Sequence, residues 1–262
     1  MHTTPTDVTD NAILNGRLHL LQPKRGHRFG HDAILLAAAV PAQGGERVAE
    51  FGAGVGAASL ALLARVPDIS ATLFEIDATL CALARENIVR NHLSQRARVV
   101  HRDVTAGLAP DSPSRSMEIF HHVFMNPPFN DATLQASPDS ARRQAHAADD
   151  SLLQTWVRQA SRMLYDNGAL TLIWRADGLE SVLAALKPYF PGASVIPIYP
   201  APDRAAIRII VRGYRSGARG VSILPPLTLN NRDLTPSHEA EQIMRHLGPW
   251  PPEVVHAKSE KP

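Results

Sequence analysis

The sequence predicts an α/β fold in which a mostly parallel, doubly wound sheet carries helices on both faces. Strand-like apolar runs alternate with helix-like runs along most of the chain, and the run 47–51 leads through a glycine-rich turn into an apolar helix over 57–65. The chain has 262 residues, of which 44% are hydrophobic, so it can form the core of one domain of this kind.

Composition divides the chain into three parts. Thr, Asp and Asn dominate residues 1–16, for which we expect a flexible leader. The periodic runs lie within 17–247, which we expect to form a single domain. The proline-rich residues 248–262 are expected to be a disordered tail.

Composition also excludes several classes of protein. The single cysteine, Cys81, excludes a disulfide framework and indicates a reducing, cytoplasmic compartment. The 12 histidines lack a metal-binding spacing such as His-Glu-x-x-His, so we expect no metal. No apolar run is long enough for a membrane span, so we expect no membrane partner. The net charge of +2 permits a nucleic-acid partner without requiring one.

The first elements are a short strand from Leu18, a basic turn, and a helix from about Asp32, which is a plausible N-cap. A strand over 47–51 then runs into the turn 52–56, which has glycine at its first, third and fifth positions. Glycines let the backbone turn sharply and approach a ligand closely, and the next helix offers free N–H groups at its start. The first ligand contacts are therefore expected at this turn.

The next strand-like run, over 70–77, provides a carboxylate at the spacing that a nucleoside requires. Glu75 follows Gly52 by about 20 residues, where an acid can accept hydrogen bonds from both hydroxyl groups of a ribose. Asp77 is expected to cap the helix over 78–92 instead.

Two further strands end in polar residues. The run 97–101 leads to Asp103, which can accept a hydrogen bond from the exocyclic amine of a cofactor adenine, although a solvated turn aspartate would look the same. The run 119–125 leads to Asn126. Because the carboxyl ends of parallel strands meet at one edge of a sheet, we expect all these groups to lie together.

The sequence Asn126-Pro127-Pro128-Phe129 forms a stiff corner after this fourth strand. Each proline fixes its own φ, removes an N–H and holds the preceding residue extended. Such a corner can present the Asn126 amide oxygen and the Pro127 carbonyl to the two hydrogens of a planar –NH2 group, while the Phe129 ring stacks on the flat system that carries it. This pattern predicts an amino group being prepared as a nucleophile.

Downstream of the corner we expect a long loop over 131–150, in which Arg142 and Arg143 either contact phosphate or form a solvated surface. The remaining patterns predict helices over 152–165, 179–190 and 237–247, and strands over 169–174, 194–199 and 206–212.

Arginines are densest between positions 204 and 219. Arg208 and Arg212 would share one face of the last predicted strand. This face could bind a phosphate backbone, or the charges could protect an edge strand; the sequence leaves both interpretations open.

In these features the chain resembles the class I S-adenosylmethionine-dependent methyltransferases, in the amino-methylating branch marked by (Asp/Asn/Ser)-Pro-Pro-(Tyr/Phe/Trp). The matching stretches are Glu50-Phe-Gly-Ala-Gly-Val-Gly56, Phe74-Glu-Ile-Asp77, Arg102-Asp103 and Asn126-Pro-Pro-Phe129. The segment Gln22–Ala37 is similar to the segment that precedes the cofactor loop in bacterial tRNA1(Val) adenine-N6 methyltransferases.

The resemblance implies a Rossmann-like sheet of seven strands with the last strand antiparallel, S-adenosylmethionine as cofactor, and an adenine of tRNA as target. It implies a catalytic corner at Asn126, Pro127, Pro128 and Phe129. It implies cofactor contacts at Asp32, Glu50, Gly52, Ala53, Gly54, Gly56, Glu75, Ile76, Asp103, Val104 and Asn126, and substrate contacts at Phe129, Arg142, Arg143 and Arg208.

Three alternatives remain open. An N5-glutamine methyltransferase of a protein such as a release factor presents the same –NH2 geometry, but such enzymes carry a helical substrate domain ahead of the core. A guanine-N2 rRNA methyltransferase would carry a duplicated amino-terminal domain. A cofactor-binding module without transfer activity is the alternative that is not an enzyme. The sequence predicts no oligomeric state.

Overall fold

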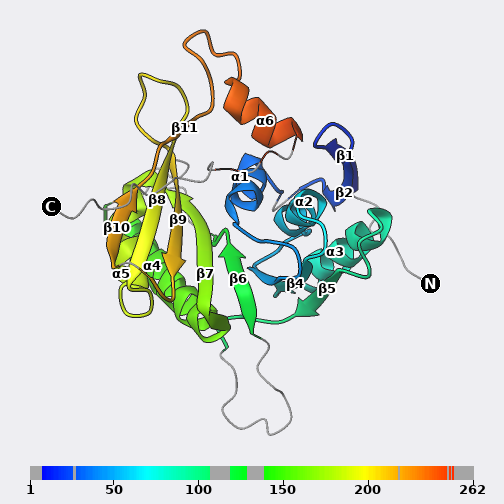
Figure 1. The fold of residues 1–262 in the computed structure, drawn as a ribbon, viewed down its shortest axis with the longest axis horizontal. Helices are drawn as coiled ribbons and strands as arrows, with labels where there is room; N and C mark the ends of the chain where they lie inside the picture. Colours follow the sequence, from blue (N-terminus) through cyan, green and yellow to red (C-terminus); the bar gives the residue numbers. More distant parts are fainter. Residues whose placement is uncertain are drawn as a thin grey trace, which may run out of the picture.

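The computed structural model describes residues 8–25, 28–106, 119–128, 139–217, 219–246, 248 and 250, and for 139–149 it describes the backbone alone. Its centre is a sheet of nine strands in the order β10-β8-β9-β7-β6-β3-β4-β5, with β11 also paired to β8 (Figure 1). The strands are β3 (Arg47–Phe51), β4 (Ser70–Glu75), β5 (Ala97–His101), β6 (Phe120–Met125), β7 (Leu164–Arg175), β8 (Gly192–Tyr199), β9 (Arg208–Tyr214), β10 (Gly220–Ile223) and β11 (Leu227–Thr228).

The predicted doubly wound topology is confirmed. Strands β5, β4, β3, β6 and β7 are parallel, and the strand order reverses between β3 and β6. Strand β9 runs antiparallel to both β7 and β8, so seven strands reproduce the sheet that the resemblance implies. The count of seven is wrong for the whole sheet, because β10 and β11 extend it beside β8. Both are too short for a hydrophobic period to reveal them.

Helices cover both faces of the sheet (Figure 1). They are α1 (His31–Ala39), α2 (Ala57–Arg65), α3 (Ala78–Arg90), α4 (Asp139–Arg162), α5 (Leu179–Leu186) and α6 (His238–His246), with a 3-10 turn at Ala176–Gly178. None of the helices in the described ranges combines the length and the apolar character that crossing a bilayer requires.

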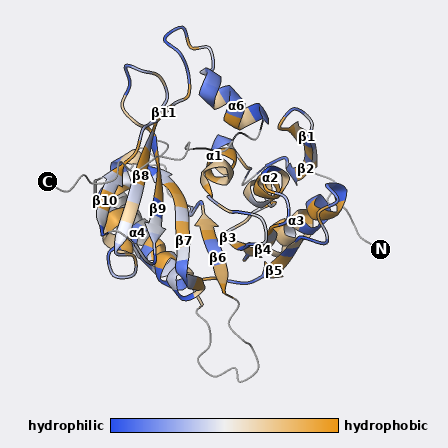
Figure 2. Cartoon of the chain, viewed as in Figure 1, coloured by the Kyte–Doolittle hydropathy of each residue, from blue (hydrophilic) through white to orange (hydrophobic). Residues whose placement is uncertain are grey.

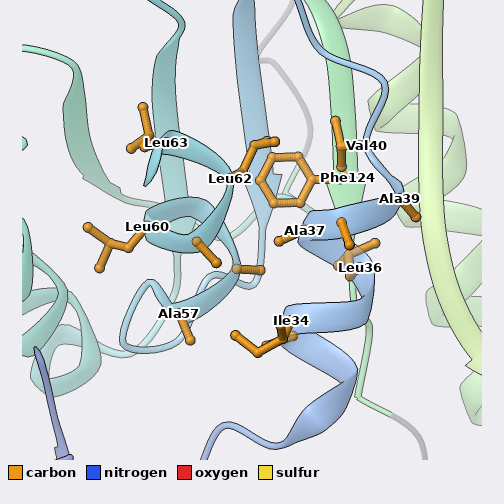
Figure 3. Packing of buried hydrophobic residues seen from close by; sticks show 14 of the residues in the cluster. Ile34, Leu36, Ala37, Ala39, Val40, Ala57, Leu60, Leu62, Leu63 and Phe124 are labelled. Atoms are coloured by element: carbon orange, nitrogen blue, oxygen red, sulfur yellow. The ribbon is translucent and has the colours of Figure 1, made fainter. Parts of the chain in front are cut away.

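Two apolar cores lie on the two faces because neighbouring strand residues point in opposite directions. Phe124 of β6 packs with residues of α1 and α2, including Leu36 and Leu62 (Figure 3). Its neighbours Val123 and Met125 belong to the opposite core, which also contains residues of α4 and α5.

The prediction of a flexible leader over 1–16 is wrong for residues 8–16. Val8–Ile13 (β1) pairs antiparallel with Leu18–Pro23 (β2). Leu14, Asn15 and Gly16 all adopt positive φ in the turn between them. The hairpin alternates polar and apolar residues only weakly, which explains why its sequence reads as a leader.

The predicted loop over 131–150 is wrong for residues 139–150, which form the first half of α4; residues 131–138 lie outside the described ranges. The polar composition of this stretch favours a loop on polarity alone. Its alanines, arginines and glutamine are nevertheless good helix formers, and that propensity agrees with the structure.

Helix α1 is held at both ends by arginines. Arg208 Nε donates to Asp32 Oδ2 at 2.9 Å in the first turn, and Arg212 donates to the Ala39 carbonyl at the last residue. Arg65 of α2 donates to the carbonyls of Ala37 and Val40, which satisfies acceptors at the negative end of the helix dipole. Asp32 is therefore not the N-cap; Gly30 is, and its backbone carbonyl accepts from Ala33.

The end of the described chain returns to α1. Figure 2 shows hydrophilic and hydrophobic residues side by side on α6, whose Ala240 and Ile243 are buried. Trp250 is only 3% exposed, and its backbone N–H donates to the Ala38 carbonyl at 3.1 Å. The expected disordered tail over 248–262 is thus wrong at Trp250, and residues 251–262 lie outside the described ranges.

Candidate functional site

The strand register brings the predicted strand ends together at one edge of the sheet. Phe51 of β3 pairs with Met125 of β6 on one side and with Phe74 of β4 on the other. Gly52, Glu75 and Asn126 therefore follow three adjacent strands at the same level. Glu75 in turn pairs with His101, the last residue of β5. Residues 102–103, which follow this strand, therefore extend the same edge.

The turn 52–56 has a backbone that favours glycine. Gly52, Gly54 and Gly56 have φ of 64°, 56° and 87°, a region that other residues enter at a cost. A Cβ on Gly52 would lie 2.6 Å from Trp156 Cη2, so this glycine also permits a close approach between the turn and α4. The turn is followed directly by the N-terminus of α2, as ligand-binding turns of this type require.

Glu75 holds the turn and its own strand exit. One carboxylate oxygen accepts from Gly54 N at 2.7 Å, and the other accepts from Ile76 N and Asp77 N, each at 2.9 Å. Ala53 N donates to the Phe74 carbonyl at 3.0 Å. The Ile76 side chain is 62% exposed, which is unusual for a large apolar residue beside a buried acid and provides an apolar surface at this edge.

Glu50 is a buried acid beneath the turn. Its Oε2 accepts from Ser59 N at 2.9 Å and from Ser59 Oγ at 2.5 Å, in the first turn of α2. Burial raises the pKa of Glu50 to about 8, against the lowering effect of the Ser59 hydrogen bonds, and the nearby charge of Glu75 raises it further. The side chain is therefore protonated at neutral pH.

Asp103 caps the turn after β5. Its Oδ1 accepts from Thr105 N at 2.7 Å and from Thr105 Oγ1 at 2.6 Å, and these bonds lower the pKa of the carboxyl group. The adjacent Val104 is partly buried against the core that contains α4. Asp103 is thus an ionised acid at the edge, and its contact with the cofactor adenine stays a prediction.

The corner after β6 places a buried acceptor at this edge. Asn126 Oδ1 is inaccessible to solvent and has no hydrogen-bond partner among the described residues. Pro127 is buried and Pro128 is exposed, and Phe129 lies outside the described residues. Buried side-chain acceptors are usually paired, so this oxygen calls for an explanation.

The predicted substrate residues are not brought together with this edge by any described contact. Arg142 and Arg143 lie on α4, but their side chains are outside the description. Arg208 and Asp32 bind each other instead of presenting separate groups, and their predicted roles stay predictions. Arg212, at 9% exposed, is buried against α1 and donates to the Ala39 carbonyl, so its guanidinium group is used within the fold.

Three residues at the edge have no assigned role in the sequence interpretation of this site: Ser59, Asn87 and Trp156. Asn87 is fully buried and donates to the Val55 carbonyl in the glycine turn at 3.0 Å. Trp156 packs edge-on against Phe51, with ring centroids 6.3 Å apart, and its Nε1 is buried without a partner. For Asn87, the sequence does contain a signal: a polar side chain at a helical position whose preceding neighbours on the same face are apolar. Within the described ranges, no group of three His, Cys, Asp or Glu side chains could hold a metal ion.

Comparison with known proteins gives a family match: a model of the methyltransferase small domain matches residues 28–190. The chain is 30% identical over 189 residues to the tRNA1(Val) (adenine(37)-N6)-methyltransferase of Porphyromonas gingivalis, covering 68% of this chain and 69% of the relative. An enzyme of the same name from Bacteroides thetaiotaomicron is 28% identical over 163 residues, which cover 62% of this chain and 65% of the relative, just under two thirds of its length.

Solved structures share the fold. A protein from Agrobacterium tumefaciens described as a predicted O-methyltransferase is 27% identical, with a TM-score of 0.71 and coverage of 85% of this chain and 100% of that chain. The 16S rRNA N2 G1207 methyltransferase of T. thermophilus, solved with AdoMet and guanosine, is 18% identical, with a TM-score of 0.54 and coverage of 80% of this chain and 50% of that chain.

Proposed function

The chain is an S-adenosylmethionine-dependent methyltransferase of the methyltransferase small domain family, and on that premise we propose that it methylates the N6 amino group of an adenine in tRNA. One observation carries the proposal: Asn126 Oδ1 is a buried acceptor without a partner, one strand away from the glycine turn. Leaving such a group unpaired costs about 1–3 kcal/mol, which a donor –NH2 group would offset. Other buried atoms lack partners too, but Asn126 follows the strand that adjoins the turn.

The residues of the edge fit the proposed cofactor. The turn 52–56 gives backbone N–H groups and close approach. Glu75 Oε2 accepts from Gly54 N and has a further lone pair for a ribose hydroxyl, and Ile76 covers one face of the adenine. Three further residues support this arrangement. Glu50 accepts from Ser59 in the first turn of α2, Ala53 N donates to the Phe74 carbonyl, and Val104 packs against the core that contains α4. S-adenosylmethionine supplies an electrophilic methyl group, so the protein's own residues need only bind, align and exclude water.

In the proposed reaction the adenine lies out of its stack on Phe129, and its N6 hydrogens meet Asn126 Oδ1 and the Pro127 carbonyl. These acceptors favour a tetrahedral nitrogen whose lone pair faces the methyl carbon. The N–C bond forms as the C–S bond breaks, S-adenosylhomocysteine leaves, and N6 loses one proton. No strong base is needed, because the sulfonium is already a good leaving group.

An amine suits this corner better than an alcohol, because a hydroxyl group has one hydrogen to offer two acceptors. This argument separates the proposal from the O-methyl transfer suggested for the Agrobacterium protein. The choice of tRNA adenine rests on the activity for which the relatives are named, two of which are 28% and 30% identical to this chain.

The test is transfer of a tritiated methyl group to total tRNA, rRNA and release factor, followed by nucleoside analysis of the labelled RNA. We expect N6-methyladenosine in tRNA from the wild type and a loss of about 100-fold or more in Asn126→Ala, with little change in cofactor affinity. Asn126→Asp keeps an acceptor oxygen and should retain more activity than the alanine variant.

Each rival predicts a different label. Labelled release factor would favour the protein glutamine reaction, N2-methylguanosine would favour the rRNA reaction, and a base-stable O-methyl ether would favour the hydroxyl reaction. Cofactor binding without any transfer would favour a binding module. Transfer that survives Asn126→Ala would remove this residue from catalysis.

A further inference from the structure

Two asparagines of α3 bind the hairpin strand β2 as a neighbouring strand would. Asn87 Oδ1 accepts from Leu21 N at 2.7 Å, and Asn87 Nδ2 donates to the Leu21 carbonyl at 2.9 Å. One turn later, Asn91 Oδ1 accepts from His19 N at 2.9 Å and Asn91 Nδ2 donates to the His19 carbonyl at 2.8 Å. Side-chain amides thus form hydrogen bonds with the backbone N–H and C=O groups of alternate residues along the edge of β2.

The two asparagines differ in their remaining hydrogen bond. Asn87 Nδ2 also donates to the carbonyl of Val55, inside the glycine turn, at 3.0 Å. Asn91 Nδ2 donates its other hydrogen to the Asn87 carbonyl within α3 at 2.7 Å. Asn87 is 0% exposed, so its three bonds form without competing water. One amide therefore connects the hairpin and the turn directly.

Apolar packing joins the same two segments. Leu21 of the hairpin, Val55 of the turn and Leu83 of α3 form a small buried cluster of their own, apart from the two main cores, with Phe29 and Leu80 packed against it. The hairpin therefore contacts the turn through side chains as well as through the Asn87 amide. A shift of either segment would disturb the other.

We infer that Asn87 is a positioning residue that couples the seating of the hairpin segment, residues 18–23, to the shape of the glycine turn. Binding of the methyl donor then stabilises both together. The inference rests on the proposed function only in placing the donor at the turn, and it does not depend on the identity of the methyl acceptor.

The first test measures binding of S-adenosylhomocysteine by calorimetry to the wild type, Asn87→Ala and the matched control Asn91→Ala. Both variants remove two hydrogen bonds to β2, but only Asn87→Ala frees the Val55 carbonyl. We expect Asn87→Ala to weaken binding about three- to tenfold and Asn91→Ala to weaken it less than about twofold. Equal losses in the two variants would overturn the inference, because the shared bonds to β2 would then account for the effect.

A second measurement applies even if Asn87→Ala does not fold. Backbone amides of residues 18–22 should exchange hydrogen more slowly when S-adenosylhomocysteine saturates the wild type. Asn91→Ala should keep this protection, and Asn87→Asp, which retains an acceptor for Leu21 N but loses both donated bonds, should reduce it. Unchanged exchange in the wild type would overturn the inference.

These assays use no RNA, so they separate the two proposals. A wild-type chain that fails to bind S-adenosylhomocysteine would overturn the proposed donor and the coupling together. Normal binding with no methyl transfer to tRNA would leave the coupling intact and would count only against the proposed acceptor.

Discussion

The carboxyl edge of β3 and β6 and the arginines around α1 use their polar side chains differently, although each region contains a buried side-chain atom without a partner in the part of the chain that the structure describes. Around α1, Arg208 binds Asp32, and Arg65 and Arg212 bind backbone carbonyls through their terminal nitrogens. At the carboxyl edge, three glycines have positive φ and the Asn126 side-chain oxygen has no partner.

This difference shows which sequence signals lead to a ligand site. The arginines are the densest charges in the chain, yet the structure uses those on the inner face of β9 to hold a helix. The corner carries no charge at all, yet it contains Asn126 Oδ1, one of several buried atoms that have no hydrogen-bond partner within the described ranges. The proposed site therefore rests on unpaired hydrogen-bonding capacity beside the glycine turn and not on charge density.

The largest effect that would sharpen this comparison is expected for Gly52→Ala. The added Cβ would lie 2.6 Å from Trp156 Cη2 and would sit at a φ of 64°. We expect a loss of about 2–4 kcal/mol of unfolding free energy, measured by urea denaturation, together with loss of S-adenosylhomocysteine binding. Gly45→Ala is the matched control, since its φ is 85° with nothing within 4 Å. Equal costs for the two variants would contradict the steric account.

The next effect concerns pH and the buried acid of the same edge. Because the pKa of Glu50 is raised from 4.5 to about 8, the folded chain retains a proton that the unfolded chain releases. Unfolding free energy should therefore fall as pH rises from about 4.5 to about 7, by about 3 kcal/mol from this group. Glu50→Gln should remove that part of the decline. Denaturation curves with the same pH dependence in both proteins would show that Glu50 does not titrate this way.

Around α1, Arg212→Met should lower the unfolding free energy by about 2 kcal/mol. The substitution leaves the Ala39 carbonyl buried without the Arg212 donor. It also removes a neighbouring positive charge. Burial is the larger cause that lowers the pKa of Arg65 to about 10, and the charge of Arg212 is the smaller one. We expect no change in tRNA affinity by filter binding. Weakened RNA binding in a folded variant would restore this arginine as a substrate contact.

The smallest effect is expected for Arg208→Ala. Its ion pair with Asp32 is partly exposed on both sides, at 28% and 24%, so the pair should contribute less than about 1 kcal/mol at low salt and less at high salt. Asp32→Asn is the matched variant, and a double-mutant cycle in thermal unfolding isolates the pair. A coupling well above this value would indicate a more buried pair than the structure shows.

Much of the fold was predictable because the apolar runs that indicate strands end at residues that favour turns, so the two signals agree on where each strand stops. The strands 47–51 and 97–101 have the predicted bounds, and Asp77 caps α3 as expected by accepting from Thr79 N and Leu80 N. The alignment of Gly52, Glu75 and Asn126 at one edge follows from parallel strands alone.

What the sequence could not give depends on contacts between distant segments. Nothing local indicates that Arg212 would bind the Ala39 carbonyl, or that Asn87 would bind both Leu21 and Val55. The roles of the site residues, including Phe129, stay predictions. These roles depend on contacts with bound ligands and on residues outside the described ranges, and a sequence pattern does not determine such contacts.

The hydrogen bond from Trp250 to Ala38 has a consequence for how the chain matures. On a ribosome, residue 38 emerges long before residue 250, so the helix that precedes the glycine turn lacks one of its terminal partners until residue 250 has emerged. Nascent chains of increasing length should therefore acquire protease resistance around residues 31–39 only late, after the carboxyl-terminal segment has left the exit tunnel.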